Sequence, residues 1–162
     1  MIRSIFILAA TILVSHTVYA GLLIEPHLGY GFGNAKGKTT PTFGGQDFSS
    51  TETEISLGAR LGYKFSTGLF TAIDPQLGIA GKAKPDNGDS ADQTRTQVFA
   101  VIGYDFSVLR AYGGYAILNE VKGNSSDASG GAALKIGAEV SVLPRVSLNV
   151  EYHVNNYKEI KD

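Results

Sequence analysis

Apolar and polar residues alternate along most of this chain, most regularly over residues 54–65. There the odd positions are apolar, whereas the even positions carry Glu, Ser, Gly, Arg and Lys. A period of two is typical of a β-strand whose two faces meet different environments. The stretch is longer than the ~5–6 residues of an ordinary globular strand, and its apolar face ends in Tyr63 and Phe65, as at a membrane interface. We therefore predict a membrane-spanning strand between lipid and a lumen.

The same alternation predicts further strands at 24–33, 69–81, 95–106, 109–120, 131–143 and 146–154. The connections between these strands alternate in length along the chain. Long polar segments lie at 34–53, 82–94 and 121–130, and short connections lie at 66–68, 107–108 and 144–145. Short periplasmic turns and longer extracellular loops are typical of outer-membrane barrels. The predicted fold class is all-β, an antiparallel up-and-down transmembrane β-barrel over residues 21–162, with Ala80 among its inward-facing positions. Aromatic residues beside two of the short turns predict a periplasmic girdle: Tyr63, Phe65, Tyr104 and Phe106.

Residues 1–20 have the composition of a secretory signal peptide. Arg3 precedes an apolar run of roughly ten residues, which is shorter than the ~20 needed for a membrane-spanning helix. Val18 and Ala20 are small residues at the positions that a signal peptidase reads, so we predict cleavage between Ala20 and Gly21.

The number of predicted strands is odd, with seven visible of an expected eight. Bacterial single-chain barrels have even numbers, beginning with eight. An open barrel would expose unpaired backbone groups to lipid, so we expect the barrel domain to be incomplete at its C-terminal end. The alternative is that a neighbouring segment or a second chain closes it.

Composition excludes several classes of function. The formal net charge is −1. The chain therefore lacks the excess of basic residues that would indicate a nucleic acid as its partner. The chain has no cysteine, which excludes a disulfide framework, a thiolate metal site and a cysteine nucleophile. We predict no cofactor and no metal.

The inward-facing positions carry charged side chains of both signs together with two histidines. They are Glu25, His27, Glu54, Arg60, Lys64, Asp74, Asp105, Arg110, Lys135, Glu139, Glu151 and His153. A barrel of eight strands is just wide enough for its side chains to fill it, and buried charges must pair. The prediction is a structural network of ion pairs that plugs the lumen. The alternative is a narrow conduction path, or a proton-sensitive switch at His27 or His153.

Catalysis is weakly supported. His153 lies two residues from Glu151, but Ser147 on the same strand is roughly 20 Å away, so a serine partner would have to come from another strand. The predicted face is also the lumen, whereas an enzyme that acts on lipid needs an outward-facing site. We expect no enzymatic activity.

The chain resembles the OmpA/OmpX-like superfamily of small outer-membrane β-barrels. The resemblance rests on Ile-Glu-Pro-x-Leu-Gly-Tyr at 24–30, Leu-Gly-Ala-Arg-Leu-Gly-Tyr at 57–63 and Leu-Asn-Val-Glu-Tyr at 148–152. It implies a Gram-negative outer membrane, contact with outer-membrane lipid, and assembly through periplasmic chaperones and the barrel-assembly machinery. The expected function is a non-enzymatic envelope protein that displays polar loops for surface interaction with an unidentified ligand. The alternative is a narrow porin-like channel for ions or small solutes. The resemblance also implies a less favoured third class, a lipid A-modifying enzyme such as an acyl hydrolase.

Overall fold

The computed structural model describes residues 2–14, 20–38, 47–85, 89–123, 127–129, 131–143, 146–157 and 159–161. Among these residues, no helix is long and apolar enough to cross a membrane. The strands are β1 (Ile2–Val14), β2 (Gly21–Lys38), β3 (Asp47–Lys64), β4 (Leu69–Pro85), β5 (Ala91–Asp105), β6 (Leu109–Gly123), β7 (Asp127–Ser129), β8 (Ala133–Leu143), β9 (Val146–Tyr157) and β10 (Glu159–Lys161).

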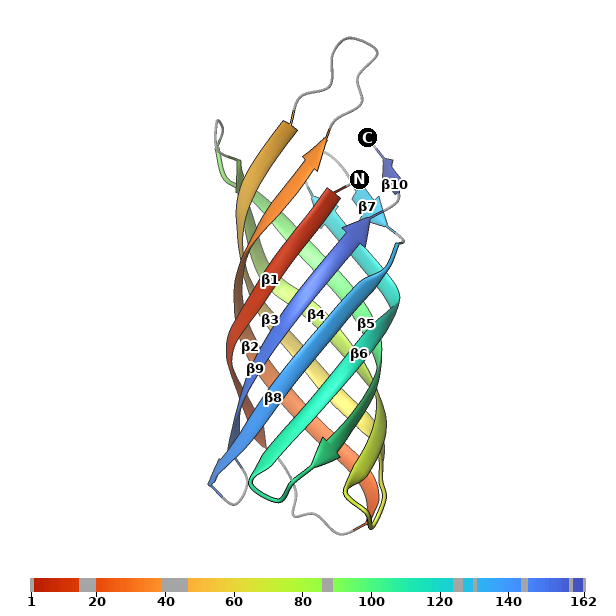
Figure 1. The fold of residues 1–162 in the computed structure, drawn as a ribbon. Helices are drawn as coiled ribbons and strands as arrows, with labels where there is room; N and C mark the ends of the chain where they lie inside the picture. Colours follow the sequence, from red (N-terminus) through yellow and green to blue (C-terminus); the bar gives the residue numbers. More distant parts are fainter. Residues whose placement is uncertain are drawn as a thin grey trace.

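The long strands form one closed antiparallel barrel (Figure 1). Each strand from β2 to β6 pairs with the next in sequence, β6 pairs with β8, and β8 pairs with β9. The short strands β7 and β10 pair with each other, and β7 also pairs with β6 near the long-hairpin end. The predicted up-and-down barrel is confirmed, and every strand predicted from the alternation is present.

The ring is completed by β1, which pairs with β2 on one side and with β9 on the other. This segment lies within the region assigned above to a signal peptide. The structure does not bear on proteolysis, so cleavage between Ala20 and Gly21 stays a prediction, as does the expected C-terminal incompleteness. The pairing has a clear physical basis, because two unpaired strand edges in lipid would leave backbone groups without hydrogen bonds.

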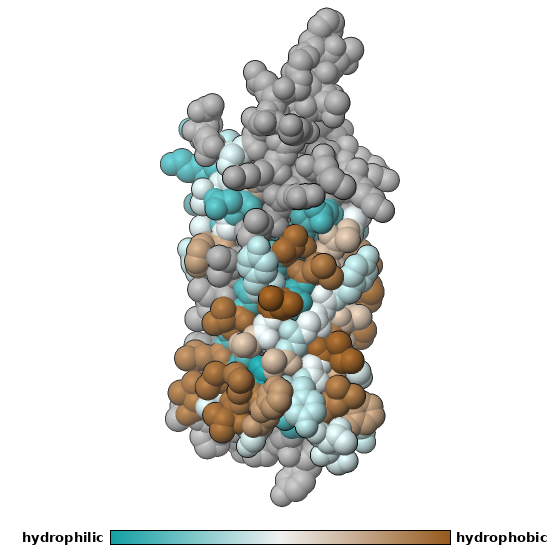
Figure 2. All heavy atoms as spheres, in the orientation of Figure 1, coloured by the Kyte–Doolittle hydropathy of each residue, from teal (hydrophilic) through white to brown (hydrophobic). Residues whose placement is uncertain are grey.

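Burial alternates, as a period of two requires, along the strands whose side chains the structure describes. In β2, buried side chains such as Glu25 and His27 alternate with exposed ones such as Ile24 and Leu28. The exposed face is rich in Leu, Ile, Val and aromatic residues, and Figure 2 shows these apolar side chains over the middle and lower wall. Most charged side chains along the apolar band are therefore inside the barrel, together with a few rings such as Phe70 and Phe99, and most large apolar side chains are outside, the reverse of a water-soluble protein.

Two irregularities shift the alternation. Ile79 and Ala80 are both exposed, and the pairing register of β4 shifts at this point against β3 and β5. Ile117 and Leu118 are likewise both exposed, beside the register shift between β5 and β6. A β-bulge adds one residue to one strand and thereby reverses the faces that follow. The prediction that Ala80 faces inward was wrong for this reason.

The hairpins at the end opposite the short turns are longer than predicted. Strand β2 continues to Lys38, β3 begins at Asp47, β4 reaches Pro85 and β5 begins at Ala91. The predicted loop boundaries at 34–53, 82–94 and 121–130 were therefore wrong. Beyond the apolar band both faces of a strand can be polar, so the ladder of backbone hydrogen bonds continues where the alternation has ended.

The short turns match the prediction at two places. Residues 66–68 turn at Gly68, whose φ is 93°, and its amide donates to the carbonyl of Phe65 at 3.0 Å. Ser107 has a φ of 81°, and its amide donates to Asp105 Oδ1 at 2.9 Å. The third predicted turn, at 144–145, lies outside the described residues.

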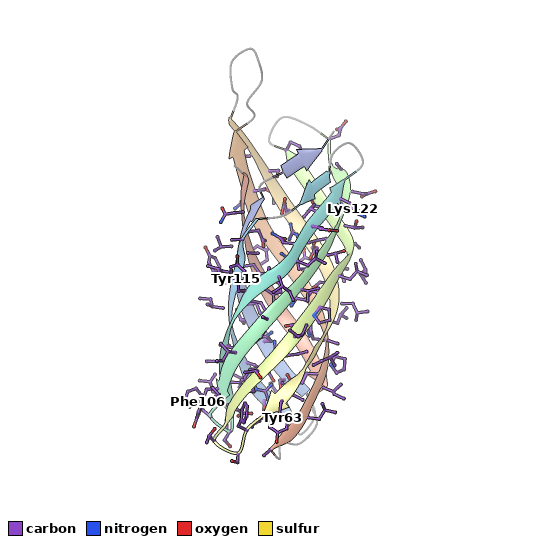
Figure 3. All side chains as sticks on the ribbon, turned by 90° about the vertical axis from the view of Figure 1, so that its right-hand side faces the viewer. Tyr63, Phe106, Tyr115 and Lys122 are labelled. Carbon is purple, nitrogen blue, oxygen red and sulfur yellow. The ribbon has the colours of Figure 1, made fainter. Side chains whose placement is uncertain are left out.

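The position of the lipid-facing wall generates a test on one strand. Ala100 and Ala91 are both exposed residues of β5, but Ala100 pairs with Tyr115 near mid-height of the wall, whereas Ala91 begins the strand at the long-hairpin end (Figure 3). We expect Ala100→Arg to lower the free energy of unfolding by about 2–4 kcal/mol, and Ala91→Arg by about 0–1 kcal/mol. Urea titration of protein folded in lipid vesicles measures both. Equal costs for the two variants would contradict the assigned membrane position.

Candidate functional site

The candidate site is the lumen, where the inward-facing positions of the strands converge. The structure places the predicted lumen residues inside the barrel; most are buried, and Lys64 and Asp105 are partly buried at the short-turn end. The register of the paired strands brings these side chains together. Glu25 of β2 lies opposite Arg60 of β3, and Arg110 of β6 lies opposite Glu139 of β8.

Arg60 lies at the centre of the network and is fully buried. Its guanidinium contacts carboxylates from four other strands. They are Glu25 of β2 at 3.3 Å and Asp74 of β4, Glu139 of β8 and Glu151 of β9 at 3.5 Å each. A planar guanidinium presents several donors in fixed directions, so this one side chain connects distant parts of the barrel wall.

A second cation, Lys135 of β8, extends the network along the lumen. Its Nζ lies 2.5 Å from Asp74 Oδ2 and 3.5 Å from Glu151 Oε1. Glu151 also accepts a hydrogen bond of 2.5 Å from the Tyr112 hydroxyl and lies 2.8 Å from Nε2 of His153. His27, the other predicted histidine, has Nε2 3.6 Å from Asp74 Oδ1.

The network continues to the short-turn end through Arg110. This guanidinium contacts Glu25 and Asp105, the latter at 3.1 Å. Asp105 in turn pairs with Lys64 at 2.6 Å. The charged chain therefore runs from the middle of the lumen to the turn at Ser107.

Sequence reasoning missed a polar cluster near the long-hairpin end. Arg95 pairs with Glu52 at 2.8 Å and lies 3.6 Å from Glu54, so Glu54 belongs to this group. The side-chain amide of Gln97 donates to Asn119 at 2.9 Å and to Asn155 at 2.8 Å. The sequence contains part of the information needed to predict this cluster. Glu52 lies two residues before Glu54 on the same strand, so its side chain faces the same side.

Aromatic rings also pack against the buried cations. The Arg60 guanidinium carbon is 4.1 Å from the centre of the Tyr112 ring, and Lys135 Nζ is 4.5 Å from that of Phe99. Arg110 lies over Phe70 at 5.2 Å. Such cation–π contacts stabilise a desolvated cation more than a solvated one, and the rings also occupy volume inside the barrel.

The remaining predicted site residues lie outside the lumen. Tyr63 and Phe65 pack edge to face with ring centres 5.2 Å apart, and Tyr104 and Phe106 lie 4.7 Å apart. Tyr63 and Phe106 are both at the short-turn end (Figure 3). Ala20 is exposed, and Gly21 begins β2.

The structure also places the residues that were considered for catalysis and for metal binding. His153 is buried in the lumen, and Ser147 is six residues away on the same strand. Within the described ranges, no group of three or more His, Asp or Glu side chains is arranged to hold a metal ion. The chemistry that the lumen residues provide is mutual charge compensation.

Comparison with known proteins finds one family. The model of the outer membrane protein beta-barrel domain matches residues 6–162. No curated protein and no solved structure matches the chain.

The contact between Tyr112 and Glu151 can be tested with a matched pair on β6. Tyr112 faces the lumen, whereas Tyr115 is exposed on the outer wall (Figure 3). We expect Tyr112→Phe to lower the free energy of unfolding by about 1.5–3 kcal/mol, because it removes a buried hydrogen bond to a charged group. Tyr115→Phe should change it by less than about 0.5 kcal/mol. Urea unfolding compares the two, and a larger loss at Tyr115 would refute the network.

Proposed function

Because this chain belongs to the outer membrane protein beta-barrel domain family, we propose that it is a non-enzymatic structural protein of the bacterial outer membrane. In this proposal the lumen is closed by ion pairs, and the long hairpins are displayed on the cell surface for interaction with a ligand. The family places the chain in the outer membrane. Beyond this location, we propose a plugged lumen, a role at the cell surface and the absence of catalysis.

The contacts of Arg60 are the observation that carries this proposal. A cation that contacts four carboxylates of four strands, with no exposed surface, occupies the middle of the lumen. Breaking such a network requires charges to be left unpaired in a region of low polarity, which costs several kcal/mol. The favourable state is therefore the connected one, and a solute would have to displace it.

The orientation follows from the two ends of the barrel. The short turns and the aromatic cluster of Tyr63, Phe65, Tyr104 and Phe106 are assigned to the periplasm, since outer-membrane barrels have short periplasmic turns and interfacial aromatic girdles. The long hairpins then lie outside the cell. Export to the periplasm, followed by delivery by periplasmic chaperones to the barrel-assembly machinery, is the route that this proposal includes. Cleavage after Ala20 during export would remove β1 and open the β2 and β9 edges, so the closed barrel proposed here is that of the chain that keeps β1.

The burial of His153 supports a non-enzymatic function. Its Nε2 is 2.8 Å from Glu151 Oε2 inside the lumen. A lipid A hydrolase needs its histidine accessible to an acyl chain in the membrane. Acyl release from lipid A by the folded protein is the assay whose positive result would favour the enzyme.

The test of the plugged lumen combines stability with conductance. We expect wild-type protein in planar bilayers to show no stepwise conductance. Arg60→Ala should lower the free energy of unfolding by about 3–5 kcal/mol, because buried carboxylates lose their partner, and should leave solute flux through liposomes unchanged. Lys84→Ala, which removes an exposed cation from β4, should change neither quantity.

Two further results complete this test. Arg60→Met removes the charge while retaining much of the side-chain volume, so a cost similar to that of Arg60→Ala would assign the loss to charge rather than to a cavity. Increased leakage through Arg60→Ala without loss of stability would overturn the plug and favour a narrow porin-like channel.

A further inference from the structure

Strand β1 is paired on both of its edges along almost its whole length (Figure 1). On the β9 edge the register runs from Ile2 opposite Tyr157 to Val14 opposite Val146. On the β2 edge the ladder reaches His27. A strand placed in this way is held by two ladders of backbone hydrogen bonds, and not only by its covalent connection to β2.

The two edges that flank β1 run in the same direction, because β2 and β9 are both antiparallel to it. A second copy of the chain in the same membrane orientation could offer its β9 edge to β2 only as a parallel strand, whereas outer-membrane barrels are built of antiparallel strands. The position between β2 and β9, which we call the seam, therefore requires one strand that runs opposite to both. Residues 2–14 meet this requirement.

The β2 side of the seam ends at a proline. The pairs between β1 and β2 reach His27, and the next residue toward the start of β2 is Pro26. Proline lacks an amide hydrogen, so within a sheet it occurs at an edge or where the ladder is interrupted. Pro26 thus lies where the ladder with β1 ends, while its pairing with β3 continues through Ala59.

The bond between Ala20 and Gly21 lies at the short-turn end of the barrel. Ala20 is exposed, and it lines a hollow of about 360 Å³ together with Lys64, the turn at 66–68 and Ser107. Gly21 begins β2 opposite Lys64. The bond is therefore within reach of a protease in solution, and it lies outside both ladders of β1.

We propose that β1 remains in the seam as a separate strand when the bond between Ala20 and Gly21 is cut in the folded barrel, so that the seam is a binding site for the segment 2–14. Cutting this bond removes no hydrogen bond of either ladder. Departure of β1 would leave the edges of β2 and β9 unsatisfied in lipid, which is costly. The order of events then decides the outcome, because cutting before folding separates the segment, whereas cutting after folding leaves a closed barrel of two chains. The proposal rests on the closed barrel and is independent of whether the lumen conducts.

The test cuts the folded full chain at this bond. Replacement of residues 15–20 by Glu-Asn-Leu-Tyr-Phe-Gln, followed by the native Gly21, provides a site for TEV protease, and purified signal peptidase acting on the unaltered chain is the second route. We expect the cut protein in unheated detergent to keep the gel mobility of the uncut barrel and to show the summed mass of both fragments by native mass spectrometry. Heating should separate them. Loss of the small fragment or of the folded mobility would overturn the proposal, as would resistance of the folded protein to both proteases under conditions that cut the unfolded chain.

Exchange between chains tests the seam itself. A fluorescent peptide of residues 2–14 should exchange into the cut barrel and should not bind the uncut barrel, in which β1 is still attached. Ile7→Pro removes an amide donor in the middle of the segment, opposite Phe32 and Tyr152, and should speed release of the cut segment at least about tenfold. Ile2→Pro, at the end of the ladder, is the matched control and should change release by less than about twofold. Binding of the peptide to the uncut barrel, or equal release in the two variants, would contradict the proposal.

Discussion

The structure depends on the requirement that backbone N–H and C=O groups in a membrane be satisfied by the protein itself. A sheet meets this requirement only when it has no free edge, and the ring from β1 to β9 has none. Closure creates an interior that is too narrow to hold bulk water. The inward positions must then be filled, and the charges placed there must find partners. The Arg60 network is thus a consequence of closing the sheet.

The chain satisfies this requirement with a limited set of side chains. Cations and carboxylates compensate one another across strands, and Phe70, Phe99 and Tyr112 occupy volume beside the cations. Each cross-strand pair also fixes the register of the strands that contribute it, because a slip of one residue would turn a charged side chain toward lipid. Charge pairing in the lumen and apolar contact outside therefore select the same arrangement.

The sequence predicts the strands and their faces well because one physical rule, alternation between lipid and lumen, governs them. It fails where that rule no longer applies. Hairpin ends beyond the apolar band lack alternation, so the start of β3 at Asp47 and the Glu52–Arg95 pair were missed. A bulge is a local backbone event without a clear pattern, so Ala80 was assigned to the wrong face. The pairing of β1 is non-local, and its apolar composition also fits a signal peptide.

The unequal lengths of the strands give the barrel an oblique rim. Strands β2 and β3 each contain 18 residues, whereas β8 contains 11. At about 3.3 Å per residue and a tilt near 40°, the first hairpin extends ~45 Å along the membrane normal and β8 only ~28 Å. A hydrocarbon layer of ~30 Å covers β8 almost entirely but leaves ~15 Å of the β2–β3 hairpin beyond it. The β2–β3 side of the barrel is thereby within reach of large molecules in solution, whereas β8 itself ends level with the lipid headgroups and only the short pair of β7 and β10 continues the wall beside it.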